Sequence, residues 1–382
     1  MRRRVLFVSK PIGPPFYDGT KCLVRDLALN LTRYESTVMV SRGVKSLGYA
    51  PRAGNPGIAA AYVYAGPGAY APALGDNARA AAFLAFGARP KLWHFVFAPN
   101  PRSSSVGRAA RALRGARVVQ TVASAPRTFA PELFFGDAIV AQSNWTASRV
   151  VRALAGAGPR RSPFVRVIPP PVGPLRERSA EEIDAVARAL ELPRGVPVFV
   201  YPGDLEVSSG AETVARAVAP IVRALPSSIV VFACRPKTAE APHIERRLRE
   251  RLDPRSVRFT REVDLPALLG RATAVVFPVD DLYGKVDIPI SLLEAMRLGV
   301  PVVGLDSGPL ADLKEAIQVP AKDADALAGS AVRLFTDGVF RDRTIRAGRQ
   351  AVRERYDACV VAAAYERVYD EVLGADSPLS RP

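Results

Sequence analysis

Short runs of β-branched and other apolar residues alternate along the chain with longer stretches in which apolar residues recur at a helical period. Near-continuous apolar runs separated by helices are typical of parallel strands that are buried on both faces of a sheet. In the first half, such runs predict strands at Val5–Ser9, Thr37–Val40, Ala61–Tyr64, Leu92–Phe97, Val118–Val122, Ala138–Ala141 and Val165–Ile168. Helices are predicted between these strands, near Thr20–Arg33, Asn77–Phe86, Ser104–Arg114 and Thr146–Leu154. This half therefore predicts a doubly wound α/β domain.

A proline-rich segment separates this half from the next. Four prolines and one glycine within Pro169–Pro174 exclude a helix or a central strand, so an extended and fairly stiff connector is expected. Ser179 followed by Glu182 has the spacing of a capping box and predicts the start of a helix.

The same alternation then begins again. Strands are predicted at Val198–Tyr201, Ile229–Ala233, Val257–Phe259, Ala274–Phe277 and Val302–Gly304. Three closing helices are predicted at Ala324–Thr336, Phe340–Arg355 and Ala358–Val372. The sequence thus predicts two doubly wound, Rossmann-like parallel-sheet domains that face a cleft, with ligands at the carboxyl ends of the strands. The predicted parts are a first domain, a hinge, a second domain, and a last helix with its tail, over residues 1–168, 169–178, 179–355 and 356–382.

The composition fits two globular domains, since 48% of the 382 residues are apolar. The 53 Lys and Arg against 37 Asp and Glu give a formal charge of +16, which favours polyanionic partners such as nucleotides or phospholipid headgroups. A genome rich in arginine codons explains the same excess equally well. The charge also allows nucleic acid, but no recognised nucleic-acid-binding motif accompanies it, so no such partner is predicted.

The cysteines and histidines argue against a metal site. Cys22, Cys234 and Cys359 never have C-x-x-C spacing, and His94 and His243 are the two histidines of the chain, so no zinc constellation is predicted. No apolar stretch approaches the ~18 residues that span a bilayer, and the start of the chain lacks the apolar core of a signal peptide. We expect a cytoplasmic protein, soluble or peripheral to the inner face of the membrane.

The segment Pro289–Val303 has the pattern of a helix followed by a strand. Its initial proline suits the first turn of the helix, and Gly299 suits the end of it. The polar loop Tyr283–Asp287 precedes this helix, and a helix N-terminus with free amides suits a diphosphate. Lys285 adds a positive charge there, and Glu294 has a carboxylate that can accept hydrogen bonds from ribose hydroxyls.

This segment resembles the donor-site signature of the retaining glycosyltransferases of GT-B fold, family four, or glycosyl transferases group 1. Leu293–Met296 and Gly299–Val303 match the second half of that signature, which reads Glu-Ala-Met and then Gly-x-Pro-Val-Val. Further landmarks occur in the family's order over nearly the whole chain, at Arg4–Ser9, Asp18–Thr20, Ile139–Ser143, Val167–Pro169, Tyr201–Gly203 and Val368–Tyr369. The resemblance implies an acceptor-side first domain, a nucleotide-sugar donor domain, and a closing helix that crosses back onto the first domain.

Several positions depart from the family pattern. The first Glu of the signature falls at Val286, beside Asp287. The family's histidine after the Val118–Val122 strand falls at Ala123, which is followed by Ser124.

The donor loop departs as well. The Arg and Lys that usually follow the donor-domain glycine are replaced along Gly203–Gly210, where Asp204 brings an acid instead. Three cations in or next to the expected donor loops could supply the lost positive charge, namely Lys285, Arg235 and Lys237. The open alternatives are a donor other than a nucleoside diphosphate sugar, or an enzyme that has lost its activity and kept its fold.

The resemblance implies a metal-independent retaining glycosyltransferase with a nucleotide sugar as co-substrate and no bound cofactor. Asp280 and Asp281 are adjacent and do not form the spaced Asp-x-Asp motif of metal-dependent enzymes. Asp287, on the donor sugar, and Glu294, on the ribose, are the catalytic candidates. The donor-binding candidates are Gly19, Thr20, Gly203, Arg235, Lys237, Lys285 and Glu294, and the acceptor-side candidates are Asp18, His94 and Ser124.

Each candidate also has a plainer structural explanation. Asp287 could cap a helix, Asp204 could form an Asx-turn, and the amides of Gly19 and Thr20 could be used in ordinary capping. His94 could be a core histidine, and the remaining charged candidates could be solvated surface groups.

The acceptor is the least defined part of the prediction. Four arginines of the first domain suggest an anionic or membrane-borne acceptor, such as a lipid or a growing polysaccharide: Arg102, Arg108, Arg111 and Arg114. The alternative is that they only solvate the exposed face of a helix. The rival functions are a catalytically retired binding or scaffold protein, and a nucleotide-sugar epimerase or hydrolase. An epimerase needs acid–base carboxylates, and Asp18 is the first-domain candidate for one.

Overall fold

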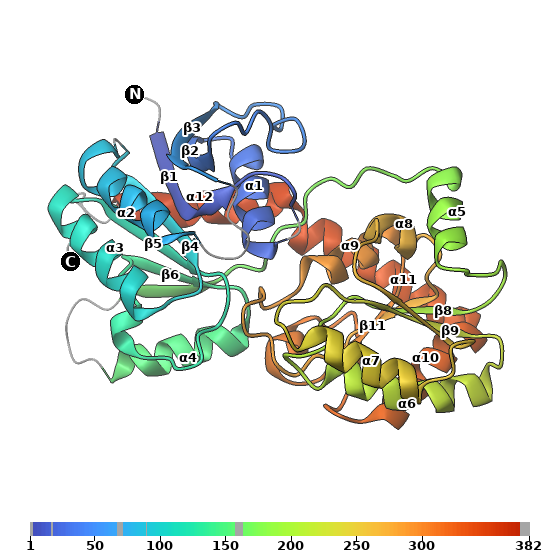
Figure 1. Cartoon of the computed structure of the whole chain (residues 1–382). Helices are drawn as coiled ribbons and strands as arrows, with labels where there is room; N and C mark the ends of the chain where they lie inside the picture. The colour runs from blue at the N-terminus through green and yellow to red at the C-terminus, as the bar shows by residue number, and fades with distance from the viewer. Residues whose placement is uncertain (1–2, 17, 67–71, 89, 157–162, 375–382) are drawn as a thin grey trace. The chain divides into compact units, whose positions relative to one another are not determined.

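The computed structural model describes residues 3–16, 18–66, 72–88, 90–156 and 163–374. The chain forms two compact units (Figure 1). Unit 1 comprises residues 1–173, 283–289 and 355–382, and unit 2 comprises residues 174–282 and 290–354. Unit 1 thus takes in the segment 283–289, which the sequence analysis places within the second domain. The expected cleft stays a prediction.

Within the described residues, unit 1 is built on a seven-stranded parallel sheet of order β3-β2-β1-β4-β5-β6-β7. Its strands are β1 (Arg3–Ile12), β2 (Tyr34–Ser41), β3 (Ile58–Tyr64), β4 (Leu92–Phe97), β5 (Arg117–Val122), β6 (Ala138–Ala141) and β7 (Phe164–Val167). Its helices are α1 (Gly19–Asn30), α2 (Leu74–Ala82), α3 (Pro101–Arg114), α4 (Asn144–Ala155) and α12 (Ala358–Gly374). The order reverses direction at β1 and β4, which is the arrangement of a doubly wound fold.

The run Val5–Val8 explains why β1 lies inside this sheet. Successive side chains of a strand point to opposite faces, so an uninterrupted apolar run supplies both. Val5 and Phe7 join a core that includes residues of α1 and α12, whereas Leu6 and Val8 join a second core on the α3 side of the sheet. Both faces of the sheet are therefore covered by helices.

Short polar side chains at the carboxyl ends of three strands start the helices that follow. Asp18 accepts hydrogen bonds from the first amides of α1, Asn100 does so for α3, and Ser143 for α4. Each cap satisfies helix amides that lack an intrahelical partner. Capping side chains therefore occupy these three helix starts, whereas α2, which begins after Ala73, has no side-chain cap.

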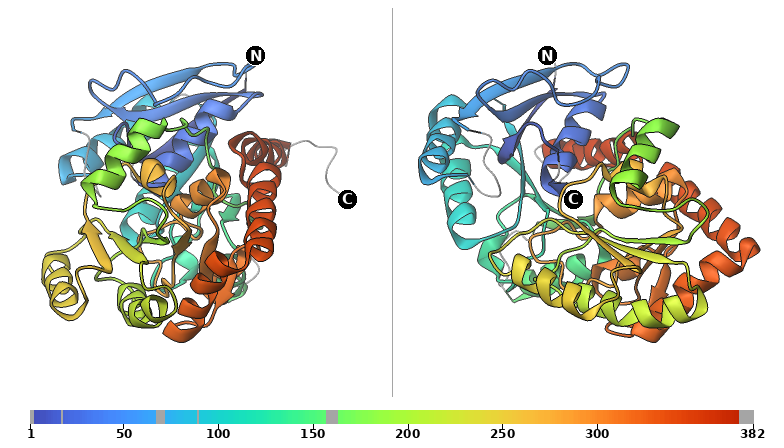
Figure 2. Two further views of the ribbon diagram at one scale, coloured as in Figure 1. Left: turned by 90° about the vertical axis from the view of Figure 1, so that its right-hand side faces the viewer. Right: turned by 45° about the vertical axis from the view of Figure 1, so that its right-hand side comes forward.

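Unit 2 has a six-stranded parallel sheet of order β10-β9-β8-β11-β12-β13, again within the described residues. Its strands are β8 (Val198–Tyr201), β9 (Ile229–Ala233), β10 (Val257–Thr260), β11 (Ala274–Val276), β12 (Val302–Leu305) and β13 (Ile317–Val319). Its helices are α5 (Ala180–Ala189), α6 (Gly210–Ala224), α7 (Ala241–Arg251), α8 (Leu265–Leu269), α9 (Ile290–Leu298), α10 (Ala324–Thr336) and α11 (Gly338–Ala351). Helices lie on both faces of this sheet as well (Figure 2).

The fold class is confirmed as two doubly wound parallel-sheet domains, and every strand expected from the sequence is present. The edge strand β13 was not expected, because its three residues, with a polar Gln318 in the middle, are too short to give a pattern. Helix α1 ends at Asn30 rather than Arg33, because Leu31 has an extended backbone. The predicted helix at Asn77–Phe86 begins earlier, at Leu74, and closes in a π-helical turn over Phe83–Gly87.

The expected return of the last helix to the first domain is confirmed, since α12 packs against α1 in unit 1 (Figures 1 and 2). The carboxylate of Glu366, which is 3% exposed, accepts hydrogen bonds from the amides of Thr32 and Arg33 at 2.7 and 2.6 Å. Tyr365 and Tyr369 are wholly buried between this helix and the sheet. The helix is therefore an integral part of the core of unit 1.

Two properties of the described residues bear on the sequence predictions. No group of three or more His, Cys, Asp or Glu side chains has an arrangement that could hold a metal ion. None of the helices described combines the length and the apolarity that crossing a bilayer requires.

Candidate functional site

The segment 283–289 is held at the carboxyl edge of the sheet of unit 1. The hydroxyl of Ser124, just after β5, accepts a hydrogen bond from the amide of Gly284 at 3.0 Å. The hydroxyl of Ser143, just after β6, donates to the carboxylate of Asp287 at 2.6 Å. The guanidinium of Arg127 lies 4.2 Å from the centre of the Tyr283 ring. Three contacts from three positions on unit 1 thus fix this loop.

The hydroxyl of Ser143 makes two hydrogen bonds. Its hydroxyl accepts from the amide of Thr146 to cap α4 and donates to Asp287, so it is fully engaged. Asp287 is 1% exposed and Ser143 is wholly buried. A short hydrogen bond to a buried carboxylate is among the stronger polar contacts in a protein. The sequence pattern indicated Asp287 but not Ser143, although Ser143 directly precedes α4, where a serine is typical of a helix cap.

The N-terminus of α1 lies against the same loop. A methyl group on Gly19 would be 3.0 Å from both methyl carbons of Val286, so the helix start and the loop are in close contact. Val286 is 4% exposed. This contact accounts for valine where the family signature has its first Glu, since a carboxylate in this packed position would be buried.

The amide of Thr20 does not support the predicted role in binding phosphate. The carboxylate of Asp18 accepts hydrogen bonds from the amides of Thr20 and Lys21 at 2.9 and 3.2 Å, and the ammonium of Lys10 lies 2.6 Å from its other oxygen. Asp18 therefore occupies the helix N-terminus that a phosphate would otherwise use. This is the capping alternative that the sequence left open for Gly19 and Thr20. Asp18, Gly19, Ser124, Lys285 and Asp287 nonetheless all belong to unit 1.

In unit 2, two acidic side chains stabilise the loop after β8, Asp204 from within it and Asp280 from the loop after β11. Asp204 is wholly buried, and its carboxylate accepts from the amides of Val207 and Ser208 at 2.7 and 3.0 Å. These amides lie three and four residues on, so Asp204 binds its own loop as the structural alternative expects, although not through the bond to residue 206 that defines an Asx-turn. Asp280 accepts from the amide and the hydroxyl of Ser209 at 2.8 and 2.6 Å. Asp204, which stands where the family usually has an arginine, therefore stabilises the conformation of its own loop.

Glu206 connects this loop to the loop after β9. Its carboxylate accepts from the amides of Lys237 and Thr238 at 2.7 and 2.9 Å. Arg235 and Lys237 thus stand beside the Gly203–Gly210 loop, with Arg235 exposed and Lys237 half-buried. Neither the sequence pattern nor the resemblance indicated that Glu206 would bring these segments together, because the two loops are some thirty positions apart.

Glu294 lies on α9 of unit 2, half-buried between the buried residues Leu293 and Ala295. Gly299 ends this helix with a φ of +83°, a left-handed conformation that favours glycine, as the sequence predicts. The segment around α9 therefore has the helix and the glycine stop that were expected from Pro289–Val303.

His94 is a core residue. It is wholly buried on β4, and its ring nitrogens lie 2.8 Å from the hydroxyl of Tyr369 and 2.7 Å from that of Thr121. Both nitrogens are thus satisfied inside unit 1. The acceptor-side role stays a prediction, but this placement favours the core alternative.

The burial of His94 predicts a pH dependence of stability. Desolvation lowers its pKa from 6.5 to about 3, so below pH 6.5 the unfolded chain takes up a proton that the folded chain does not. Stability from this group is complete above pH 6.5 and is lost as the pH falls towards 3, by about 1.4 kcal/mol per pH unit. Between pH 7.5 and 5, we expect His94 to account for a loss of about 2 kcal/mol in the free energy of unfolding.

Urea denaturation of the native chain and of His94→Gln at both pH values measures this contribution. The variant should show a smaller loss at pH 5 than the native chain. His243→Gln, at an exposed position, is the matched control and should keep the native loss. Equal losses in all three proteins would show that His94 is readily protonated in the folded state.

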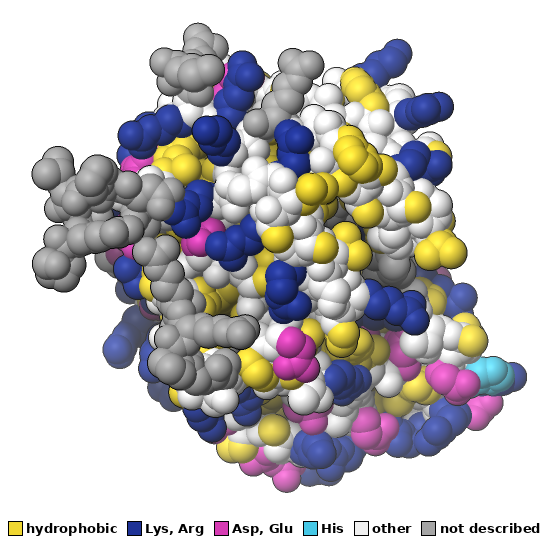
Figure 3. Space-filling view, turned by 90° about the vertical axis from the view of Figure 1, so that its left-hand side faces the viewer, with side chains coloured by type: hydrophobic (Ala, Val, Ile, Leu, Met, Phe, Trp, Pro, Cys, Tyr) yellow, Lys and Arg dark blue, Asp and Glu magenta, His cyan; other side chains and the backbone are white. Residues whose placement is uncertain are grey.

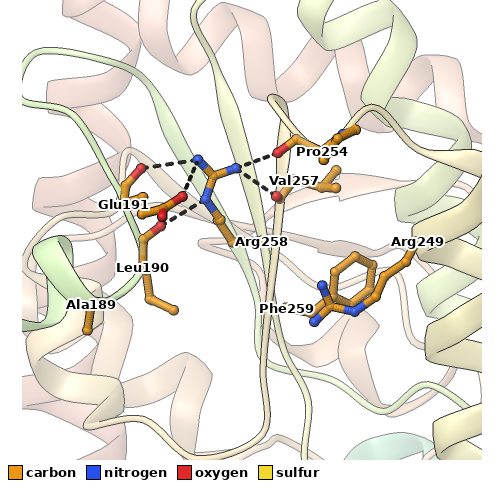
Figure 4. Close-up of a pocket in the computed structure, with 8 residues that line it drawn as sticks. All are labelled: Ala189, Leu190, Glu191, Arg249, Pro254, Val257, Arg258 and Phe259. Carbon is orange, nitrogen blue, oxygen red and sulfur yellow. Dashed lines mark hydrogen bonds and ion pairs between the residues drawn. The ribbon is translucent and has the colours of Figure 1, made fainter.

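A separate hollow in unit 2 does not belong to these loops. It has a volume of about 270 Å³ and lies near the amino end of β10, lined by Leu190, Glu191, Arg249, Val257 and Arg258 among others (Figure 4). The guanidinium of Arg258 donates to backbone carbonyls, including those of Leu190 and Val257 at 2.9 Å each. This arginine is engaged in holding the edge strand and its neighbouring turn.

Comparison with known proteins finds a family model that matches part of the chain. Residues 196–337 match the family model described as "Glycosyl transferases group 1". That segment runs from just before β8 to just after α10. It contains the loops after β8 and β9, the segment 283–289 and helix α9, so it includes most of the donor-site candidates.

Among curated proteins, phosphatidyl-myo-inositol mannosyltransferase of Mycobacterium leprae is 38% identical over 129 residues, or 32% of this chain. The counterpart in Mycobacterium tuberculosis is 37% identical over 132 residues. The match spans about a third of the length of these relatives, 33% in each case.

Solved structures resemble the chain over nearly its whole length. The Anabaena protein HepE, solved in complex with UDP and glucose, gives a TM-score of 0.68 over 97% of this chain and 100% of its own, with 15% identity. Sucrose-phosphate synthase of Thermosynechococcus elongatus gives 0.71 over 98% and 100%, with 19% identity. At such low identity these likenesses establish the GT-B-like fold.

Proposed function

We propose, because residues 196–337 match the family model of the glycosyl transferases group 1, that this chain transfers a sugar from a nucleotide-sugar donor to an acceptor. The observation that carries the proposal is the match itself, which covers the carboxyl-edge loops of unit 2 together with α9. Ligands of doubly wound folds bind at that edge of the sheet. The fold likeness to HepE, whose structure contains UDP and glucose, supports the same donor class.

The donor interactions follow from the chemistry of the candidates. Glu294 accepts hydrogen bonds from the ribose hydroxyls, whereas Asp287, which is buried and bound to Ser143, holds the loop 283–289 in place. The leaving diphosphate is stabilised by Lys285, Arg235 and Lys237 and by the N-terminus of α9. Positioned positive charge takes the place that a metal ion has in other transferases. Retention of the anomeric configuration is the stereochemistry implied by the family resemblance.

The acceptor in this proposal is anionic or borne on a membrane. The mycobacterial relatives are named as mannosyltransferases of phosphatidyl-myo-inositol, which is a lipid with an anionic headgroup. Lys and Arg side chains are spread over the face shown in Figure 3, with exposed apolar side chains between them. Such a surface attracts anionic ligands without selecting one of them.

A retired enzyme that binds a ligand or partner without turnover is the second candidate. The observation that favours it is the loop at Gly203–Gly210, where the two usual cations are absent and Asp204 is used internally. Both candidates share the fold, so ligand binding and turnover decide between them.

The decisive experiment measures donor binding by calorimetry against UDP-, GDP-, ADP- and dTDP-sugars, without added metal. We expect one nucleotide sugar to bind, and we expect Glu294→Ala and Lys285→Ala each to weaken it at least about tenfold. A charge-assisted hydrogen bond contributes about 1.5–3 kcal/mol, which corresponds to that factor.

Two exposed residues outside the candidate loops provide matched controls. Glu250→Ala on α7 and Lys314→Ala should bind the donor as the native chain does. Binding accompanied by slow hydrolysis of the donor would support the enzyme over the retired protein. No binding of any nucleotide sugar would contradict the proposed function.

A further inference from the structure

Unit 1 contains an apolar groove on the outer part of its sheet. The groove has a volume of about 550 Å³ and lies beneath the loop 43–51, against the neighbouring strands β2 and β3. That volume is within the range of about 300–1,000 Å³ found for small-molecule sites. Its apolar walls are formed by Leu29, Val38, Val40, Val44, Leu47, Ile58 and Tyr62, together with alanines of β3.

The polar side chains that line the groove include those of Lys45, Ser46 and Tyr49. Tyr49 contributes its ring, because its hydroxyl is held by the carboxylate of Asp26 at 2.9 Å and by the amide of Asn30 at 3.1 Å. Lys45 is the charged side chain among the lining residues, and it is exposed. Across the described residues it has neither a hydrogen-bond partner nor an ion-pair partner. A long apolar surface with one free cation suits a ligand that has an apolar chain and one anionic group.

The groove adjoins the site of unit 1 through a shared loop. A methyl group on Gly13 would lie 2.7 Å from a methyl carbon of Val44, and one on Gly48 would lie 3.3 Å from the Phe16 ring. The loop that covers the groove is therefore packed against the segment that leads from β1 into Asp18 and the start of α1. A ligand in the groove would have its near end close to that segment.

We propose that this groove binds the hydrocarbon chain of an anionic amphiphile, with Lys45 at its phosphate group. The proposal rests on the proposed function, in that the amphiphile is the acceptor and its chain anchors it beside the carboxyl edge of the sheet. Aliphatic side chains favour a hydrocarbon over a sugar, since sugar hydroxyls would lose hydrogen bonds to water without replacement. The absence of a carboxylate among the lining residues favours an anionic head over a cationic one.

The first test is the binding of n-octyl phosphate, below its critical micelle concentration, to the full chain by calorimetry. Ala60 on β3 is exposed and lines the groove, so Ala60→Trp should fill it and weaken binding at least about tenfold. Ala53→Trp introduces the same side chain at an exposed position that does not line the groove, and it should bind normally.

The second test separates the chain from the head. Shortening the alkyl phosphate should weaken binding by about fourfold per methylene, as expected for burial of each group. Lys45→Gln should weaken octyl phosphate about tenfold. The same variant should leave the binding of n-octanol unchanged. The chain-length series and Lys45→Gln test the proposal even if the fold does not tolerate the larger side chain of Ala60→Trp.

Nucleotide-sugar binding by the same variants distinguishes this inference from the proposed function. We expect Ala60→Trp and Lys45→Gln to bind the donor like the native chain while losing the amphiphile. Donor binding without any binding of octyl phosphate would overturn the groove proposal alone. Binding that inorganic phosphate abolishes, or that does not change with chain length, would also overturn it, because the head would then bind by itself.

Discussion

Replacing Asp26 with alanine is expected to lower the free energy of unfolding by about 3–5 kcal/mol, because it leaves a largely buried arginine without its counterion. Asp26 is wholly buried on α1, and the Arg25 guanidinium lies 2.6 Å from one of its oxygens. That oxygen also accepts from Tyr49, and the other accepts from the amide of Gly173 at 3.0 Å. Three partners thus converge on one carboxylate.

The expected loss comes from breaking this cluster rather than from a large contribution of the ion pair itself. Burial raises the pKa of the Asp26 carboxyl, and the Arg25 guanidinium beside it opposes that rise. The charge is therefore costly to bury and is tolerated because it is paired. Removing one partner leaves the guanidinium of Arg25, held near the rings of Phe16 and Tyr49, with no anion in contact.

Urea denaturation of Asp26→Ala measures the effect. Asp253→Ala removes the partner of Arg255 from a surface ion pair and serves as the control, which should change stability little because water screens exposed charges. Adding Arg25→Ala to Asp26→Ala should restore part of the loss, since the unpaired cation is then gone. A loss no larger than that of the surface control would show that the buried cluster is not needed for stability.

The second large effect is expected at Gly203, where alanine should destabilise the fold by about 1–3 kcal/mol. Its new methyl group would lie 2.1–2.4 Å from atoms of the Tyr201 ring and hydroxyl. The ring cannot move aside easily, because Tyr201 is wholly buried and its hydroxyl donates to the carbonyl of Asp204 at 2.7 Å. The rings of Phe232 and Phe277 pack around it.

Gly329→Ala is the matched control for this substitution. Gly329 lies within α10, and a methyl group there would meet no atom within 4 Å. Alanine at this helical position should stabilise the chain by about 0.4–1 kcal/mol. Opposite changes in the urea midpoint of the two variants are the expected result, and an unchanged midpoint for Gly203→Ala would contradict the packing argument. Glycine at position 203 thus has a structural requirement that is independent of any ligand.

The local pattern predicted most of the secondary structure because the information is contained in neighbouring residues. The apolar run at β1, the alternation of strands and helices in both halves, and the glycine that ends α9 are all read within a few positions. The strand β13 was missed because three residues do not establish a period. Capping at Gly19 and Thr20 was an open alternative, since a cap is a local interaction, but Asp18 was not recognised as the residue that provides it.

The candidate site was predictable in part. The sequence indicated which loops carry charge, namely those with Arg235, Lys237 and Lys285. It did not indicate that Glu206 would hold the amides of Lys237 and Thr238, or that Ser143 would bind Asp287. These contacts join residues far apart in the chain, and their partners depend on which strands become neighbours.

By itself, the sequence determined that this protein folds as two doubly wound α/β domains and that its second half resembles the group 1 glycosyltransferases. The reason is that hydrophobic period, caps and motif spacing are properties of contiguous residues. Only the tertiary structure decided that residues 283–289 pack on unit 1, that His94 is sealed in the core, and that an apolar groove with Lys45 adjoins the start of α1. Those outcomes depend on strand order and on helix α12 returning to unit 1, which bring together residues that no local pattern connects.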